Sequence, residues 1–137
     1  MNILTPETEY YHEPHLVSRC IYHIIFCTKY RRKVLNNNIQ NKIKEIIIDK
    51  QKEYNYVLLE QEIMLDHVHI LISCSAKISI HSIVSKIKGF LANKLRSEFP
   101  ELKSKLPCLW SNGKFIASVG SVSLETVKKY IENQKNI

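Results

Sequence analysis

The sequence has no apolar stretch that approaches the roughly 20 residues needed to span a membrane. Residues 1–7 also lack the charged start and the apolar run of a signal peptide. The four cysteines, Cys20, Cys27, Cys74 and Cys108, form no C-x-x-C pair, and no internal repeat or low-complexity segment is present. We therefore expect a cytoplasmic protein with reduced thiols and no membrane partner.

The length of the chain limits the number of domains. With 137 residues and 45% hydrophobic content, the chain can bury one real core but is too short for two ordinary domains. Residues 1–18 contain Pro6 and Pro14 and follow no clear period, so we expect an irregular N-terminal arm there. The single domain then covers residues 19–137.

The charge of the chain is unbalanced. Twenty Lys and Arg residues stand against thirteen Asp and Glu residues, which gives a formal charge of +7 and a pI near 9.2. Such a balance favours a polyanionic partner such as nucleic acid, although a merely soluble basic protein would share it. The compact basic segment Lys29–Lys33, with an aromatic residue inside it, favours the partner.

Hydrophobic periodicity predicts four strands and three helices. The predicted strands cover residues 19–28, 56–64, 67–73 and 114–119, and the predicted helices cover 36–55, 79–99 and a segment that starts at Ser123. The short gap between the second and third strands predicts a hairpin. This order predicts an α+β fold, namely a ferredoxin-like antiparallel sheet (βαββαβ) with an extra C-terminal helix.

Two histidines stand at a spacing of two in the third predicted strand. His67 and His69 therefore share one face of the strand, while Val68 points to the other. Two imidazoles so placed can bind one divalent metal ion if a third ligand comes from elsewhere, although such a pair is more often an ordinary polar face. His23, in the first strand, is expected to be a face residue near this site or the core rather than a ligand.

The last predicted helix offers residues that complete such a site. Tyr130 and Gln134 are four residues apart and lie on the same face of that helix. Tyr130 could simply pack beside the apolar stripe. Combined with the histidine pair, it could attack a phosphodiester, and the Gln134 amide oxygen could be the third metal ligand. A phenol with a pKa near ~10 is a poor nucleophile, so the metal would supply much of the activation.

Seven blocks of sequence together resemble the signature blocks of the small single-tyrosine HUH transposases of prokaryotic insertion sequences. They stand in the same order and cover about residues 19–135. The blocks are Tyr22–Arg32, Asp66–Ile72, Lys86–Gly89, Leu95–Pro100, Leu109–Ser111, Ser118–Gly120 and Val127–Gln134.

The resemblance implies a dimeric enzyme that cuts and rejoins single-stranded DNA at transposon ends and recognises subterminal DNA hairpins. It implies that His67, His69 and Gln134 bind Mg²⁺ or Mn²⁺, and that Tyr130 takes the 5′-phosphate and frees a 3′-OH. In this family the tyrosine helix can complete the active site of the other subunit, and Gly120 is a natural hinge before that helix.

The residues that contact DNA are predicted from charge, aromatic character and position. The candidates are Lys29, Tyr30, Arg31, Arg32, Lys33, Lys88 and Arg96. Two other functions remain open at this point. A non-catalytic RNA-recognition domain would also use a ferredoxin-like sheet, but the Gly- and aromatic-rich strand signature of that domain is missing. A metal-dependent phosphohydrolase would attack with water and would not need Tyr130.

Overall fold

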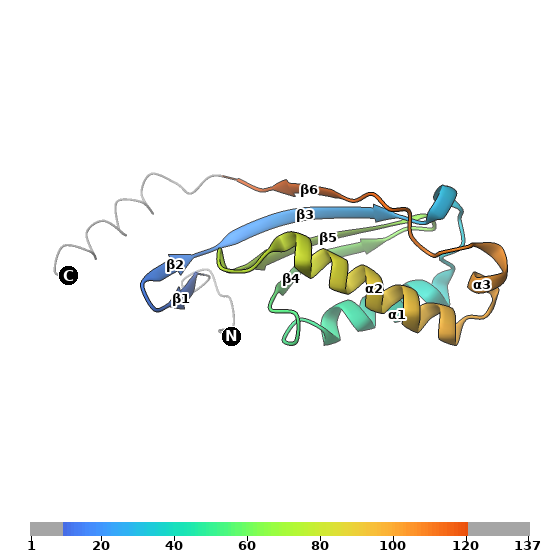
Figure 1. Cartoon of the computed structure of the whole chain (residues 1–137), viewed down its shortest axis with the longest axis horizontal. Coiled ribbons are helices and arrows are strands. Elements are labelled where there is room, and N and C mark those ends of the chain that lie inside the picture. The colour runs from blue at the N-terminus through green and yellow to red at the C-terminus, as the bar shows by residue number, and fades with distance from the viewer. Residues whose placement is uncertain (1–9, 121–137) are drawn as a thin grey trace.

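The computed structural model describes residues 10–120 of the chain. A four-stranded sheet carries the two long helices on one face, and a small two-stranded sheet precedes it (Figure 1). The elements are β1 (Tyr11–Glu13), β2 (Leu16–Ser18), β3 (Cys20–Cys27), the 3₁₀ turn η1 (Lys29–Arg31), α1 (Asn37–Asp49), β4 (Val57–Ile63), β5 (His67–Cys74), α2 (Ile80–Glu98), α3 (Glu101–Lys105) and β6 (Phe115–Ser118).

The strands of the large sheet run in the order β4-β5-β3-β6, and every neighbouring pair is antiparallel. β3 and β4 are joined through α1 but separated in the sheet by β5, which is the split βαβ arrangement of a ferredoxin-like fold. The predicted α+β fold is confirmed for this part of the chain. The predicted C-terminal helix lies outside the described residues.

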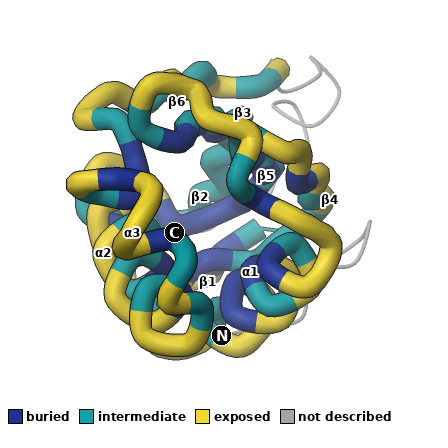
Figure 2. Tube along the Cα trace, turned by 90° about the vertical axis from the view of Figure 1, so that its right-hand side faces the viewer, coloured by how far each residue is buried: buried dark blue, intermediate teal, exposed yellow. Residues whose placement is uncertain are grey.

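The core lies between the sheet and the two long helices. Ile24 and Phe26 of β3, and Val68, Ile70 and Ile72 of β5, are at most 1% exposed. These positions alternate along their strands, so both central strands turn one apolar side toward α1 and α2. Buried segments accordingly gather in the middle of the trace, and exposed segments form its outer rim (Figure 2).

The helix boundaries follow the local sequence signals at the N-terminal ends better than at the C-terminal ends. The side chains of Asn36 and Ser79 cap α1 and α2, respectively, as their positions predict. α1 was predicted to extend to about residue 55 but ends at Asp49, where turns begin. α2 ends before Pro100, and the five-residue helix α3, which the sequence did not predict, follows directly.

The N-terminal arm is more regular than predicted. Residues 11–18 form an antiparallel hairpin of β1 and β2 instead of an irregular segment. The hairpin is anchored by Tyr11, which is buried and whose hydroxyl donates to the backbone oxygen of Ser73 in β5. Glu13 accepts a further hydrogen bond from Ser75. The hairpin depends on these contacts with residues 62 positions further along the chain. The local pattern of the sequence therefore does not predict it.

Within residues 10–120, no helix is long and apolar enough to cross a membrane.

Candidate active site

The sheet face opposite α1 and α2 carries the two predicted metal histidines. His67 and His69 alternate along β5 with the fully buried Val68 and Ile70, so they lie on the same face, as their spacing predicts. Both side chains are half-buried. Because β5 is paired with β3 on one side and with β4 on the other, the two imidazoles stand on a central strand.

His67 is oriented by the residue that precedes it. Its Nδ1 lies 2.8 Å from Oδ1 of Asp66, and the other carboxylate oxygen of Asp66 lies 3.4 Å from Nη2 of Arg31. The hydrogen bond with His67 lowers the pKa of Asp66 below its ordinary value, and the Arg31 charge acts in the same direction. An ionised carboxylate can only accept, so Nδ1 of His67 carries the proton, and in the neutral imidazole Nε2 then presents its lone pair.

His69 is paired with another histidine. Nδ1 of His23 lies 3.0 Å from Nε2 of His69, and the two rings stack at a centroid distance of 5.2 Å. His23 comes from β3, which runs beside β5. The prediction that His23 is a face residue near the candidate metal site is confirmed by this contact.

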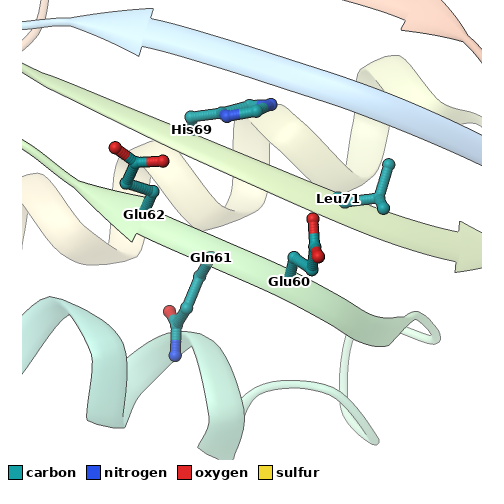
Figure 3. A pocket seen from close by; sticks show the side chains of 5 residues that line it. All are labelled: Glu60, Gln61, Glu62, His69 and Leu71. Carbon is teal, nitrogen blue, oxygen red and sulfur yellow. The ribbon is translucent and has the colours of Figure 1, made fainter.

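A shallow hollow of about 460 Å³ lies beside His69. Glu60 and Glu62 of β4 rise from the same side of the sheet as His69, whereas Gln61 points toward α1 (Figure 3). Glu62 is the direct cross-strand neighbour of His69. The carboxylates of Glu60 and Glu62 therefore make the β4 side of the hollow acidic. Such a hollow suits a bound cation better than a bound anion.

The described residues do not complete a metal site by themselves. Within residues 10–120, no group of three or more His, Cys, Asp or Glu side chains is arranged to hold a metal ion. The two remaining predicted members of the site, Tyr130 and Gln134, lie outside the described residues. A third ligand from that segment is what the sequence predicts.

The basic segment Lys29–Lys33 lies at the end of the sheet where His67 stands. Cys27, at the end of β3, is opposite His67, and the next residue, Thr28, donates its backbone N–H to the oxygen of Asp66 over 2.9 Å. Tyr30 is 69% exposed, and Arg31, Arg32 and Lys33 are exposed as well. The structure thus brings the predicted cationic segment and the histidine pair together.

Lys88 has a different environment from the one its charge suggests. Its ammonium group donates to the backbone oxygens of Ser111, over 3.0 Å, and Gly113, over 3.3 Å. The indole N–H of Trp110 in turn donates to the backbone oxygen of Lys88. Burial of the ammonium lowers the pKa of Lys88, and the neighbouring charge of Lys114 adds to this effect. Lys88 therefore holds the loop before β6 against α2 through these hydrogen bonds, in addition to any contact with DNA.

We expect Lys88→Met to destabilise the fold by about 1–3 kcal/mol, because the charged hydrogen bonds from the ammonium group to the carbonyls of Ser111 and Gly113 are lost. Urea unfolding of the full chain measures this free energy. Lys86→Met is the matched control, since Lys86 is exposed on the same helix. Equal losses in the two variants would contradict the fastening role.

Arg96 lies on the helix side of the sheet, in a groove of about 370 Å³ that Lys88, Gly89 and Lys114 also line. Its Nε is buried and has no hydrogen-bond acceptor among residues 10–120. Lys88 and Arg96 are thus grouped with each other but belong to a different surface from the histidine pair. The seven DNA candidates predicted from the sequence are thus divided between two surfaces.

Sequence reasoning assigned no role to Asp66 and no role to the carboxylates of β4. An acidic residue directly before a strand histidine was the available signal for Asp66, since metal histidines commonly donate their other N–H to a carboxylate. Glu60 and Glu62 could be placed beside His69 only through the register of β4 and β5, which contains an irregularity between Leu58 and Glu60.

The chain has clear relatives among known proteins. Residues 16–134 match the family described as IS200-like transposases. The ISDra2 transposase TnpA of Deinococcus radiodurans is 34% identical over 115 residues, which cover 82% of each protein. The transposase of the insertion sequence IS200 of Salmonella typhimurium is 30% identical over 117 residues, which cover 84% of this chain and 76% of the relative.

Solved structures agree with these matches. The crystal structure of a candidate transposase from Deinococcus radiodurans R1 superposes with a TM-score of 0.74 at 30% identity, covering 90% of this chain and 97% of that one. A REP-associated tyrosine transposase bound to a REP hairpin superposes with a TM-score of 0.57 at 12% identity. The match covers 83% of this chain and 61% of that protein, and it shows a shared fold.

The ferredoxin-like sheet with a histidine pair on the face opposite α1 and α2 is thus the scaffold of a DNA transposase. The chain belongs to the IS200-like transposase family, because the family match spans most of its length and two relatives are at least 30% identical.

Proposed function

We propose that the chain cleaves and rejoins single-stranded DNA at the ends of an insertion sequence through a 5′-phosphotyrosine intermediate. Tyr130 attacks the scissile phosphate and frees a 3′-OH, which keeps the bond energy for rejoining. His67, His69 and Gln134 hold the divalent metal ion. The observation that carries the proposal is the presentation of two oriented imidazoles on the open face, directly beside an exposed basic segment.

The donor set fits a divalent ion. In the neutral imidazole, Nε2 of His67 presents a lone pair because Asp66 accepts from Nδ1, and imidazole is a common ligand of divalent transition-metal ions. His69 would exchange the contact between its Nε2 and His23 for the metal ion. The amide oxygen of Gln134 and the DNA phosphate would supply oxygen ligands, which both Mn²⁺ and Mg²⁺ accept. When bound, the metal polarises the scissile phosphate. The chain's own residues orient the DNA strand at the metal ion.

The DNA is expected to contact two surfaces. The basic segment Lys29–Lys33 tracks the backbone near the cleavage site, with Tyr30 exposed for stacking on a base. Arg96 and Lys114 line the groove on the helix side and can bind further phosphates. The REP hairpin bound by a transposase of the same fold supports a DNA hairpin as a ligand of this chain.

We also propose a homodimer that acts in the cytoplasm, where the DNA of a prokaryotic cell lies. Among residues 10–120, β6 is an edge strand of the sheet, and an edge strand can pair with another chain through its outer backbone groups.

A phosphohydrolase that uses water is the alternative with the same metal site. An adduct-trapping assay separates the two. Single-stranded DNA that covers both flanks of the chain's own gene is labelled at the 3′ end and incubated with the full chain, with Mg²⁺ or Mn²⁺, or with EDTA. We expect the label to migrate with the protein in a denaturing gel only when metal is present.

Cleavage without a labelled protein band would contradict the tyrosine mechanism and favour water as the nucleophile. Binding without cleavage under any metal condition would instead favour a recognition domain without catalytic activity.

A further inference from the structure

Three side chains form a continuous line from the basic segment to the candidate metal site. Arg31 lies 3.4 Å from one carboxylate oxygen of Asp66, and the other carboxylate oxygen lies 2.8 Å from Nδ1 of His67. The side chain of Asp66 is only 18% exposed, whereas that of Arg31 is 69% exposed. The carboxylate thus stands between the candidate ligand on one side and the cationic surface on the other.

The backbone under this line is fixed by Thr28, which is fully buried. Its N–H donates to the backbone oxygen of Asp66 over 2.9 Å, and its hydroxyl donates to the backbone oxygen of Arg32 over 2.7 Å. The N–H of Arg31 in turn donates to the oxygen of Thr28 over 2.9 Å. Thr28 therefore joins the turn that carries Arg31 to the backbone that carries Asp66.

The turn itself has an unusual conformation. Tyr30 and Arg31 have φ angles of 60° and 52°, in the left-handed region that residues with a Cβ rarely adopt. Two such residues in succession cost free energy, and surrounding contacts must hold them in place. Beside the Thr28 bonds, the N–H of Lys29 donates to the oxygen of Leu109 over 2.8 Å. The conformation turns the chain so that Arg31 faces Asp66.

We infer that Asp66 is a positioning residue for the metal ligand His67, and that Arg31 holds Asp66 in place while it also binds DNA. Asp66 keeps the proton of His67 on Nδ1 and so keeps the Nε2 lone pair available for the metal. Arg31 bridges the DNA-binding segment and the metal site. This inference rests on the proposed function, since it assigns roles around the same site.

The guanidinium group can serve both purposes at once. It has five N–H donors in a planar fork, and the contact with Asp66 occupies one of its nitrogen atoms. The exposed remainder can bind a DNA phosphate. A phosphate bound by Arg31 would lie on the surface close to His67. One side chain would then set the position of the DNA strand relative to the metal ligand.

The test uses Asp66→Ala, Asp66→Asn and Arg31→Met in the full chain. Long-range ¹H–¹⁵N correlation spectra of the metal-free protein report which nitrogen of His67 is protonated, and calorimetry with Mn²⁺ reports metal affinity. The backbone oxygen of residue 66 that accepts from Thr28 remains in every variant, so the fold has no reason to change. Asp49→Ala, an exposed acidic residue at the end of α1, is the matched control.

We expect Asp66→Ala to give a mixture of His67 tautomers and to weaken Mn²⁺ binding by about 10-fold, as the loss of a carboxylate behind a metal histidine typically does. Asp66→Asn should keep the Nδ1–H tautomer, because its amide oxygen still accepts. Arg31→Met should weaken binding of single-stranded DNA and, because Asp66 is no longer held, should weaken Mn²⁺ binding by less than Asp66→Ala does. An unchanged tautomer and unchanged Mn²⁺ affinity in Asp66→Ala would overturn the inference.

The His67→Ala chain separates this inference from the proposed function. The double variant combines Asp66→Ala with His67→Ala. If Asp66 acts through His67, the double variant binds Mn²⁺ no more weakly than His67→Ala alone. A further loss in the double variant would refute the positioning role. If His67→Ala itself binds Mn²⁺ like the unmodified chain, the proposed metal site is wrong, and the assignment of Asp66 to that site is refuted with it.

Discussion

Tyr130→Phe is expected to abolish DNA cleavage while leaving DNA binding intact. The substitution removes the hydroxyl oxygen that would form the bond to phosphorus, and phenylalanine keeps the aromatic ring. Loss of a covalent nucleophile commonly lowers turnover by about 10⁴-fold or more. Rates of cleavage of single-stranded DNA from the flanks of the gene, measured with Mn²⁺ in excess, give the size of the effect.

Two controls make this result interpretable. A gel-shift titration with the same DNA should give the same Kd for Tyr130→Phe and for the unmodified chain. Tyr54→Phe loses the same atom from a tyrosine that packs against the core on the helix side, and it should cleave normally. Cleavage by Tyr130→Phe at the normal rate would rule out Tyr130 as the nucleophile.

His67→Ala is expected to weaken Mn²⁺ binding by at least about 100-fold. This is more than the loss of affinity expected when only a residue that hydrogen-bonds to a metal ligand is removed. The reason is that the imidazole of His67 would bind the metal directly through Nε2, whereas Asp66 contacts only Nδ1 of that imidazole. Metal-dependent cleavage should fall in parallel, and excess Mn²⁺ should restore part of it.

His81→Ala is the matched control for this experiment, because His81 is exposed in the first turn of α2, on the other side of the sheet. Calorimetric titration of both variants with Mn²⁺ compares them directly. If His81→Ala loses as much affinity as His67→Ala, the metal is bound without a specific site on β5. Thermal unfolding of both variants checks that neither loses the fold.

The sequence predicts the sheet well because its central strands are rich in β-branched and aromatic residues, and because burial alternates along most of β5. Val68, Ile70 and Ile72 face the helices, and His67 and His69 face away, as alternation requires. The N-terminal hairpin was missed for a physical reason. Its strands are three residues each, and the Tyr11 contact that holds them comes from β5, far along the chain.

The candidate site was predicted only in part for a similar reason. The spacing of His67 and His69 determines that they share a face, but it contains nothing about what holds their second nitrogens. The contact between Asp66 and Arg31 depends on a left-handed turn at Tyr30 and Arg31, which local sequence rules assign to glycine or asparagine. Similarly, the charge of Lys88 predicts a DNA contact, whereas the structure directs its ammonium to two carbonyls.

The position of β3 and β5 within the sheet has a consequence for how the protein can move. Both strands have neighbours on each side, so their backbone amides should be among the slowest in the chain to exchange with solvent. The histidine pair is therefore carried by the least deformable part of the fold. Any rearrangement during strand transfer must then take place outside these two strands, which keep His67 and His69 at fixed positions relative to each other.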